Sequence, residues 1–144
     1  MIKRFTFVIL IVGSICSGCA SGLTGVLPEV PDRNNASEIY VIRPYNYIAS
    51  ANSAYVSFDN NEIFALRTIQ YTKFMAPPGN HTIGVRYPGF PANNISIVLA
   101  PKQKYYFGVS VGFSNFSLVP KTEEEAMPHI ETSNYVSLDN SAKH

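Results

Sequence analysis

Residues 54–66 read AYVSFDNNEIFAL, and they predict two antiparallel strands joined by a tight turn. Ala54 to Phe58 and Glu62 to Leu66 are rich in β-branched and aromatic residues, which favour pleated strands. Asp59-Asn60-Asn61 lies between them and supplies the turn, because Asn and Asp tolerate the left-handed region of the backbone. This hairpin is the clearest in the chain, and it indicates a β-rich fold.

The same texture of short strands and turns continues on both sides of the hairpin. Pro78 and Gly79 fit the centre of a type II turn, since Pro presets φ and Gly takes positive φ. Alternation predicts that Ile95, Ile97 and Leu99 share one face of a strand. Five more strands are expected at 39–43, 69–76, 81–87, 94–99 and 104–112, which makes seven, and the short runs at 116–119 and 135–138 are the candidates for a further strand.

The strand expected at 104–112 or slightly beyond carries its large residues on one face, namely Tyr105, Phe107, Val109, Val111 and Phe113. Gly108, Ser110 and Gly112 face the other way, which predicts close approach of another backbone or a bend. Later, Thr122 and Glu125 have capping-box spacing and begin a helix that Pro128 makes short or irregular. Seven to eight strands with one short C-terminal helix predict an all-β fold, an antiparallel β-sandwich of the immunoglobulin or transthyretin type.

The first eighteen residues have the three parts of a secretion signal. Lys3 and Arg4 form a positive start, residues 5–12 are apolar, and small or polar residues follow. The apolar run is too short for a bilayer span, which needs about 20 apolar residues. The sequence therefore predicts export, with an uncleaved membrane anchor or a plain secretory signal as the alternatives.

The end of this segment resembles a lipobox, the cleavage and lipidation motif of bacterial lipoproteins. Gly18 precedes Cys19, and Cys16 stands where Leu is commonest. The resemblance implies signal cleavage between Gly18 and Cys19 and attachment of membrane lipid to Cys19. Two or three acyl chains on one residue anchor a protein stably, whereas one does so only marginally. Ala20-Ser21 follow in place of an Asp, which by resemblance favours the outer membrane, facing the periplasm.

We expect four segments: a signal peptide at 1–18, the lipidated Cys with a flexible tether at 19–37, a β-sandwich domain at 38–138 and a tail at 139–144. Without the signal the chain has nine Lys and Arg against ten Asp and Glu. No basic face is expected from this balance, and therefore no nucleic-acid partner. No Cys remains free for a disulfide.

The order of motifs in the domain resembles a family of small bacterial lipoproteins whose domain has no assigned function. The shared features are a strand that ends in Arg-Pro, a polar hairpin turn, a Pro-Gly-x-His-Thr turn and a strand that opens with paired Tyr. Here they are Tyr40 to Pro44, Asp59 to Asn61, Pro78 to Thr82 and Lys104 to Phe107. The resemblance covers roughly residues 38–120. It implies a β-sandwich in the cell envelope and no particular reaction.

The residue types that carry catalysis or bind metals form no pattern in the sequence. His81, His129 and His144 are far apart, and no free Cys can join them as a metal ligand. No Ser lies in a Gly-x-Ser-x-Gly pattern, and Glu123-Glu124-Glu125 lacks the alternating oxygen ligands of a calcium loop. We therefore expect no enzyme, no metal and no cofactor, and we expect His81 to open a strand.

Arg43, Tyr45 and Tyr47 are the candidate ligand contacts. Arg43 ends a strand that is apolar enough to be buried on both faces, so its charge needs a partner. One interpretation is that Arg43 binds the carboxylate or sugar of a ligand, and the other is that it reaches solvent or a nearby acid. Tyr45 and Tyr47 follow in a loop, where exposed Tyr rings stack on glycans or line protein interfaces.

Together these features predict a lipid-anchored envelope protein, a non-enzymatic binding or assembly module whose partner is an envelope protein or peptidoglycan. Two alternatives are an accessory lipoprotein of a secretion or conjugation apparatus and a peptidoglycan- or glycan-binding module. Glycan binding predicts a row of exposed Tyr beside Asn or Arg, whereas assembly predicts an apolar loop patch or an open sheet edge. An enzyme would need a pocket where a His, an acid and a hydroxyl converge.

Overall fold

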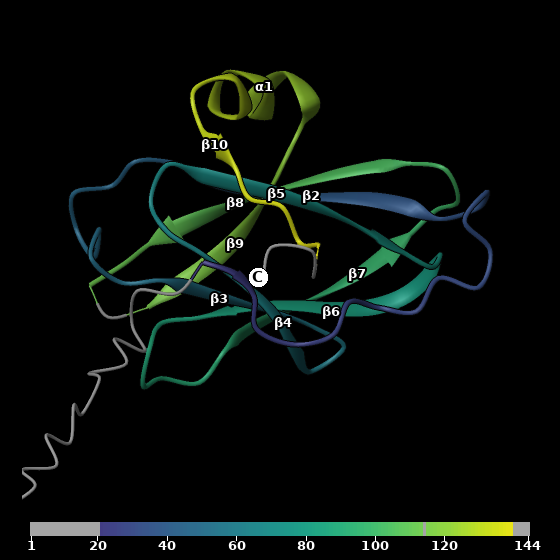
Figure 1. Cartoon of the computed structure of the whole chain (residues 1–144), viewed down its shortest axis with the longest axis horizontal. Coiled ribbons are helices and arrows are strands. Elements are labelled where there is room, and N and C mark those ends of the chain that lie inside the picture. The colour runs from purple at the N-terminus through teal and green to yellow at the C-terminus, as the bar shows by residue number, and fades with distance from the viewer. Residues whose placement is uncertain (1–20, 114, 140–144) are drawn as a thin grey trace, which may run out of the picture.

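Two β-sheets pack face to face, with one helix on the outside (Figure 1). The computed structural model describes residues 21–113 and 115–139 of the chain. The first sheet is antiparallel throughout, in the order β1-β4-β3-β6-β7. Its strands are β1 (Gly22–Leu23), β4 (Asn61–Leu66), β3 (Ala54–Phe58), β6 (Gly79–Arg86) and β7 (Asn93–Leu99). The prediction of an all-β sandwich is confirmed.

The second sheet has the order β10-β5-β2-β8-β9. Its strands are β10 (Asn134–Tyr135), β5 (Gln70–Ala76), β2 (Ser37–Arg43), β8 (Lys104–Val111) and β9 (Phe116–Lys121), and helix α1 (Glu123–Glu131) follows β9. This sheet is mixed rather than purely antiparallel, because β2 runs parallel to β8 and β10 parallel to β5. Parallel neighbours need a long crossover. Between β2 and β8 the chain crosses to the first sheet and back twice, through β3 and β4, then β5, then β6 and β7.

The strand order differs from that of an immunoglobulin constant domain, in which the first and second strands are neighbours in one sheet. Here the first long strand, β2, lies between β5 and β8, while β3 lies in the other sheet. The chain thus has the predicted sandwich architecture, with a strand order other than that of the immunoglobulin constant domain.

The core lies between the sheets and follows the alternation of the strands. Fully buried apolar residues come from both inner faces, among them Ile39, Val41, Val56, Phe64, Ile83, Val85 and Leu99. Val98, on the opposite face of β7 from Leu99, is 70% exposed. The sequence predicted that Phe113 lies on the same face as Phe107 and Val109 of β8, and this prediction is wrong. β8 ends at Val111 and the Gly112 N–H donates to the Asn115 carbonyl, so the turn carries Phe113 out into solvent.

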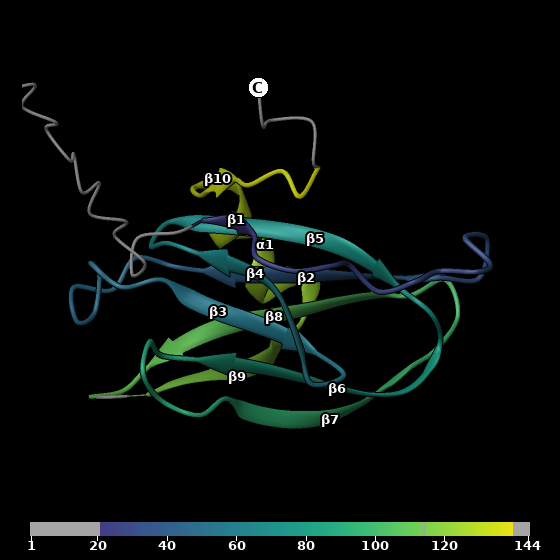
Figure 2. The same cartoon turned by 60° about the horizontal axis from the view of Figure 1, so that its bottom comes forward.

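The two ends of the sandwich are built differently. We call the end formed by residues 44–53, 67–69, 87–92, 112–113 and 115 the loop end. The end formed by residues 59–60, 77–78 and 100–103 is the turn end. In Figure 2 the loop end lies on the left and the turn end on the right. The connections at the loop end are longer, and they carry Tyr45 and Tyr47.

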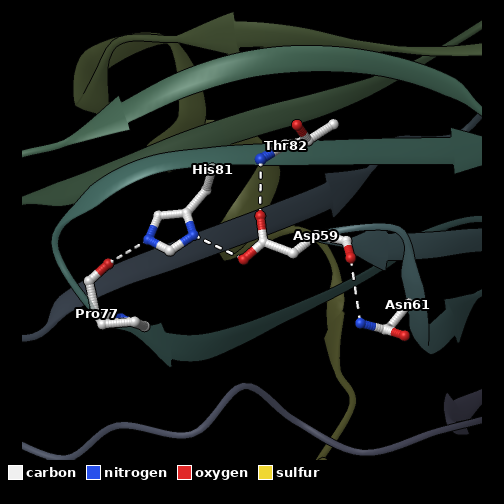
Figure 3. A network of polar contacts seen from close by, with 5 residues as sticks. All are labelled: Asp59, Asn61, Pro77, His81 and Thr82. Atoms are coloured by element: carbon white, nitrogen blue, oxygen red, sulfur yellow. Dashed lines mark hydrogen bonds and ion pairs between the residues drawn. The ribbon is translucent and has the colours of Figure 1, made fainter.

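Hydrogen bonds tie the turns of the turn end together (Figure 3). The Asp59 carboxylate accepts the Thr82 N–H at 3.0 Å, and its other oxygen lies 2.8 Å from His81 Nδ1. His81 Nε2 lies 2.8 Å from the Pro77 carbonyl oxygen. Both partners of the ring are acceptors, so the imidazolium, with a proton on each nitrogen, satisfies both contacts. His81 is thus the third residue of β6, which begins at Gly79, and bridges two turns.

Part of the segment predicted to be a flexible tether pairs with the edge of the first sheet. Gly22 and Leu23 pair with Ala65 and Phe64 of β4. The Gly25 N–H donates to the Ile63 carbonyl at 3.2 Å. A Cβ atom at Gly25 would lie 2.0 Å from the Glu62 carbonyl oxygen, so only glycine permits this approach. We call residues 22–29 the N-terminal strap. The strap docks because β4 would otherwise have an open edge. The composition of the strap alone does not indicate this docking.

Candidate binding groove beside the helix

Helix α1 begins where the sequence predicted and lies on the outer face of the second sheet (Figure 1). The Thr122 hydroxyl accepts the Glu125 N–H at 3.2 Å, and the Glu125 carboxylate accepts the Thr122 N–H at 2.9 Å. This reciprocal capping box satisfies two free donors of the first turn. Pro128 lies inside the helix, which is nine residues long. Because only Thr122 separates β9 from α1, the helix must stay close to the sheet.

A second, smaller apolar cluster holds the helix on the sheet. Residues of β2 and β8 alternate, so Ile42 and Tyr106 point to the outer face while their neighbours enter the core. Ala126 is fully buried against them, and Ile130 packs beside it. The helix therefore forms a ridge on the outer face, with a hollow on each side.

The hollow on the side of β9 and the loop end is the candidate binding site, and we call it the helix groove. It has a volume of about 280 Å³. Apolar residues, among them Ile42, Gly108, Val119 and Ala126, line it together with five polar side chains, those of Tyr45, Asn46, Ser110, Lys121 and His129. Ligand sites combine apolar lining residues with a few polar groups that converge on the ligand, and this groove offers both.

Gly108 keeps the floor of the helix groove open. It is buried, and a Cβ atom there would lie 3.3 Å from Cε of Lys121. The Lys121 stem therefore crosses above the glycine, because Tyr106 and Lys121 are direct cross-strand partners two residue pairs away, on the same face of the sheet. This is the close approach predicted from the glycines of β8, although the approaching group is a side chain rather than a backbone.

The charges of the helix groove favour an anionic group. Lys121 and His129 line it, and no Asp or Glu is among the lining residues. Glu125 lies outside the groove, on the first turn of α1. The hydrogen bond from the Thr122 backbone, aided by the charge of Lys121, holds the pKa of Glu125 below its usual range. A carboxylate brought to Lys121 would gain from the same positive charge.

The helix groove does not have the arrangement of a hydrolytic site. No hydrogen bond joins Ser110 to His129 in the part of the chain that the structure describes. No acid lines the groove to orient the imidazole, as a nucleophile-base pair requires. Among residues 21–113 and 115–139, no group of three or more His, Cys, Asp or Glu residues could hold a metal ion.

The hollow on the other side of α1 contains tyrosines, but most of them are engaged. The rings of Tyr40 and Tyr106 stack with centroids 4.9 Å apart, and Tyr106 is only 6% exposed. Burial raises the pKa of Tyr40, and its hydrogen bond to Glu38 raises it further. Tyr135 is half exposed and lies beside Tyr71 with a centroid distance of 5.4 Å. On this side of the helix, the exposed tyrosines predicted for glycan binding are therefore reduced to this one pair.

Arg43 points into the molecule and is 1% exposed. Its Nη1 donates to the Leu66 carbonyl at 2.7 Å, and its Nη2 donates to the Ala49 carbonyl at 2.9 Å. The guanidinium also lies 5.0 Å from the centroid of the Phe116 ring. Burial, with a smaller effect of Arg67, lowers the pKa of Arg43 to about 10. Arg43 meets neither solvent nor an acid; it binds the backbone of the loop end.

The other sequence-predicted site residues are separated. Tyr45 lines the helix groove, whereas Tyr47 is 84% exposed at the loop end. Gly18 and Cys19 lie outside the described residues. The sequence reasoning missed Ser110, Lys121 and His129 as one group. The alternation of residues along the two strands indicates that Ser110 and Lys121 point to the outer face. That they line the same groove as His129 depends on how α1 folds back over the sheet.

Comparison with protein-family models, with curated proteins and with solved structures found no match to this chain. Within the described residues, α1 is the longest helix, and it falls well short of the length and apolarity that crossing a bilayer requires. The case for a function therefore depends on the sequence signals and on the geometry of the chain itself.

Proposed function

We propose that this protein is a non-enzymatic binding module of a bacterial envelope, anchored through lipid on Cys19, whose helix groove binds a carboxylate-bearing peptide segment of an envelope partner. The observation that carries the binding part is the combination of an apolar floor with Lys121 and His129 and no lining acid. A carboxylate on an extended peptide is the chemistry that matches this lining. The anchoring part rests on the lipobox of Gly18-Cys19.

The assembly role is favoured over an enzymatic one by what surrounds the groove. Exposed apolar residues gather on the neighbouring loops, which is typical of interaction surfaces. The outer edge of β7 is also open in the described part of the chain, and the run from Ile95 to Leu99 has no charge or Pro to block pairing. An accessory role in a secretion or conjugation apparatus would be one case of this proposal, and no observation singles it out.

A glycan-binding role is the second candidate, because one observation favours it. Tyr71 and Tyr135 form an aromatic pair on the outer face, and Tyr135 is half exposed. Sugar rings stack on such faces. Lys73 lies near this pair, but the Asn or Arg expected for hydroxyl recognition is not among the residues lining the adjoining hollow.

Site-specific photocrosslinking tests the groove. We would place a photocrosslinking residue at Ser110, which lines the groove, and at Ser96 as the control, an exposed strand residue on the outer face of the first sheet. Both variants are made in the full-length chain and activated in intact cells. The proposal expects one defined adduct from position 110 that position 96 does not form, and loss of that adduct in a Lys121→Glu background.

Cys19→Ala, run alongside, tests the anchor separately. We expect the mass of lipid on the N-terminal peptide of the wild type and a shift of Cys19→Ala out of the membrane fraction. If the adduct from position 110 contains peptidoglycan fragments, the ligand of the groove is the cell wall and not a peptide of a partner protein. Equal adducts from positions 110 and 96 would contradict a specific site at the groove.

A further inference from the structure

Large exposed apolar residues gather at the loop end of the sandwich. Five of them lie on three of its loops: Tyr45, Tyr47, Ile48, Phe90 and Phe113. Phe113 is 99% exposed and Tyr47 is 84% exposed, so neither has a partner within the domain that would account for it. Apolar side chains this exposed, and collected at one end, mark a surface that meets something apolar.

The loops that carry these residues are almost free of charge. The loop-end segments contain no Asp, Glu or Lys, and their single charged residue is the exposed Arg67. At the turn end, by contrast, Asp59 and Lys102 lie in the connections themselves. A surface of aromatic and aliphatic side chains with one cation suits the interfacial layer of a bilayer whose headgroups are anionic.

The loop end presents its apolar residues as one connected surface. Phe90 and Phe113 line a single open hollow of about 540 Å³, so their two loops are neighbours. The Asn52 side-chain amide donates to the Tyr87 hydroxyl at 2.7 Å, which joins residues 44–53 to residues 87–92. Arg43 holds the first of these loops from inside. The loops are therefore supported by the scaffold.

The N-terminal strap enters the fold at this same end. Gly22 pairs with Ala65, one residue before the end of β4 at the loop end, and the strap then runs along β4 toward the turn end. Cys19 is three positions before Gly22 in the sequence, and three residues of fully extended chain span at most about 10 Å. Docking of the strap leaves no long spacer between the lipidated residue and the domain.

From these observations we infer that the loop end is a membrane-contacting surface, which inserts Tyr47, Phe90 and Phe113 into the interface of the bilayer that holds the lipid on Cys19. The inference rests on the proposed lipid anchor. It adds an orientation: the turn end points away from the bilayer. The helix groove, which reaches Tyr45 at the loop end, opens sideways just above the lipid headgroups.

The chain contains no Trp, so a single Trp reports on its own position. We would make Phe113→Trp at the loop end and Val98→Trp as the control, since Val98 is 70% exposed on β7 near the turn end. Both full-length, lipidated proteins are reconstituted into phosphatidylethanolamine–phosphatidylglycerol vesicles with brominated acyl chains. We expect Phe113→Trp to lose about half of its emission and to shift to the blue, because interfacial side chains reach roughly 5–10 Å into the boundary with the acyl chains. Val98→Trp should keep its emission.

The outcomes separate this inference from the proposal on which it rests. If the protein floats with the vesicles but Phe113→Trp is no more quenched than Val98→Trp, the loop end does not meet lipid and the inference is overturned, while the anchor stands. If emission of Phe113→Trp changes only when envelope proteins are added, a protein covers the loop end instead. If wild type and Cys19→Ala both fail to float, the anchor itself fails. Substitution at Phe113 removes no contact of the core, so loss of folding would not obscure the result.

Discussion

The loop end and the turn end close the same two sheets, but they do so with different chemistry. At the turn end, short connections meet on the surface, and Asp59 and His81 bind them together through charged and backbone groups. At the loop end, longer connections with exposed aromatic residues are held from inside by one buried cation, Arg43. The difference shows how one scaffold can support a closed polar end and an apolar end that is free to bind.

The largest effect is expected when the internal support of the loop end is removed. Arg43→Met keeps most of the apolar stem but leaves the carbonyls of Leu66 and Ala49 without their donor. Because each buried acceptor left unpaired costs about 1–3 kcal/mol, we expect the free energy of unfolding to fall by about 3 kcal/mol. Urea unfolding measures the change.

Arg67→Met is the matched control for this experiment, because Arg67 is an exposed arginine of the same end. It should change the free energy of unfolding by less than about 0.5 kcal/mol. Equal stability of the Arg43 and Arg67 variants would mean that the loop end does not depend on the buried guanidinium.

Detaching the N-terminal strap should have the next largest effect. Gly25→Ala places a methyl group where only 2.0 Å separates it from the Glu62 carbonyl oxygen, so the strap must move off β4. We expect a loss of about 1–3 kcal/mol, as for other overpacked positions. Hydrogen exchange should become faster at Thr24 and Gly25 and stay unchanged in β8. The control is Ala51→Gly, an exchange of the same two residue types in an exposed loop. Gly89→Ala is not used, because the positive φ of Gly89 would itself strain an alanine.

Breaking the polar network of the turn end should cost less. Asp59→Ala removes the acceptor of the Thr82 N–H and the partner of His81, and we expect a loss of about 2 kcal/mol. Asp59→Asn keeps an acceptor oxygen and tolerates the positive φ of this residue, so it should lose less. Thermal unfolding of both variants gives the comparison. If the Asn and Ala variants are equally destabilised, the acceptor oxygen that Asn retains contributes nothing, and this expectation for the hydrogen bond to Thr82 is wrong.

The smallest effect is a pH dependence at the turn-end half of β2. Burial raises the pKa of Glu38, but the hydrogen bonds from Lys73 and Tyr40 and the charges of Lys73 and Lys104 outweigh it, so the pKa is lowered overall. Stability from this group is therefore present above the unfolded value of about 4.3 and is lost as pH falls through the lower folded value.

Glu38→Gln should thus be less stable than wild type by under about 1 kcal/mol at pH 7, since the partner Lys73 is partly exposed. At pH 3 the gap between the two proteins should narrow. The measurement is urea unfolding at the two pH values, with the exposed Glu131→Gln as control. A gap that widens on acidification would contradict this assignment of the charges.

Much of the fold could be predicted because its signals are local. β3 has the bounds read from the sequence, β4 begins one residue earlier, and the capping box of Thr122 and Glu125 is present. Phe113 could not be placed, because alternation continues past the point where Gly112 turns the chain. The site was less predictable. Tyr45 could be selected because it lies in a loop, but Lys121 and His129 line the same groove only because α1 folds back over the sheet.

By itself the sequence determined most of the strands and turns and the helix start, because each depends on residues within a few positions of one another. Only the tertiary structure decided that β2 lies beside β8, that the strap docks on β4 and that Arg43 faces inward. It also brought the apolar loops together at the end where the strap enters. All of these are contacts between segments that are distant in the sequence. They form because the apolar faces and open edges of the sheets must be covered.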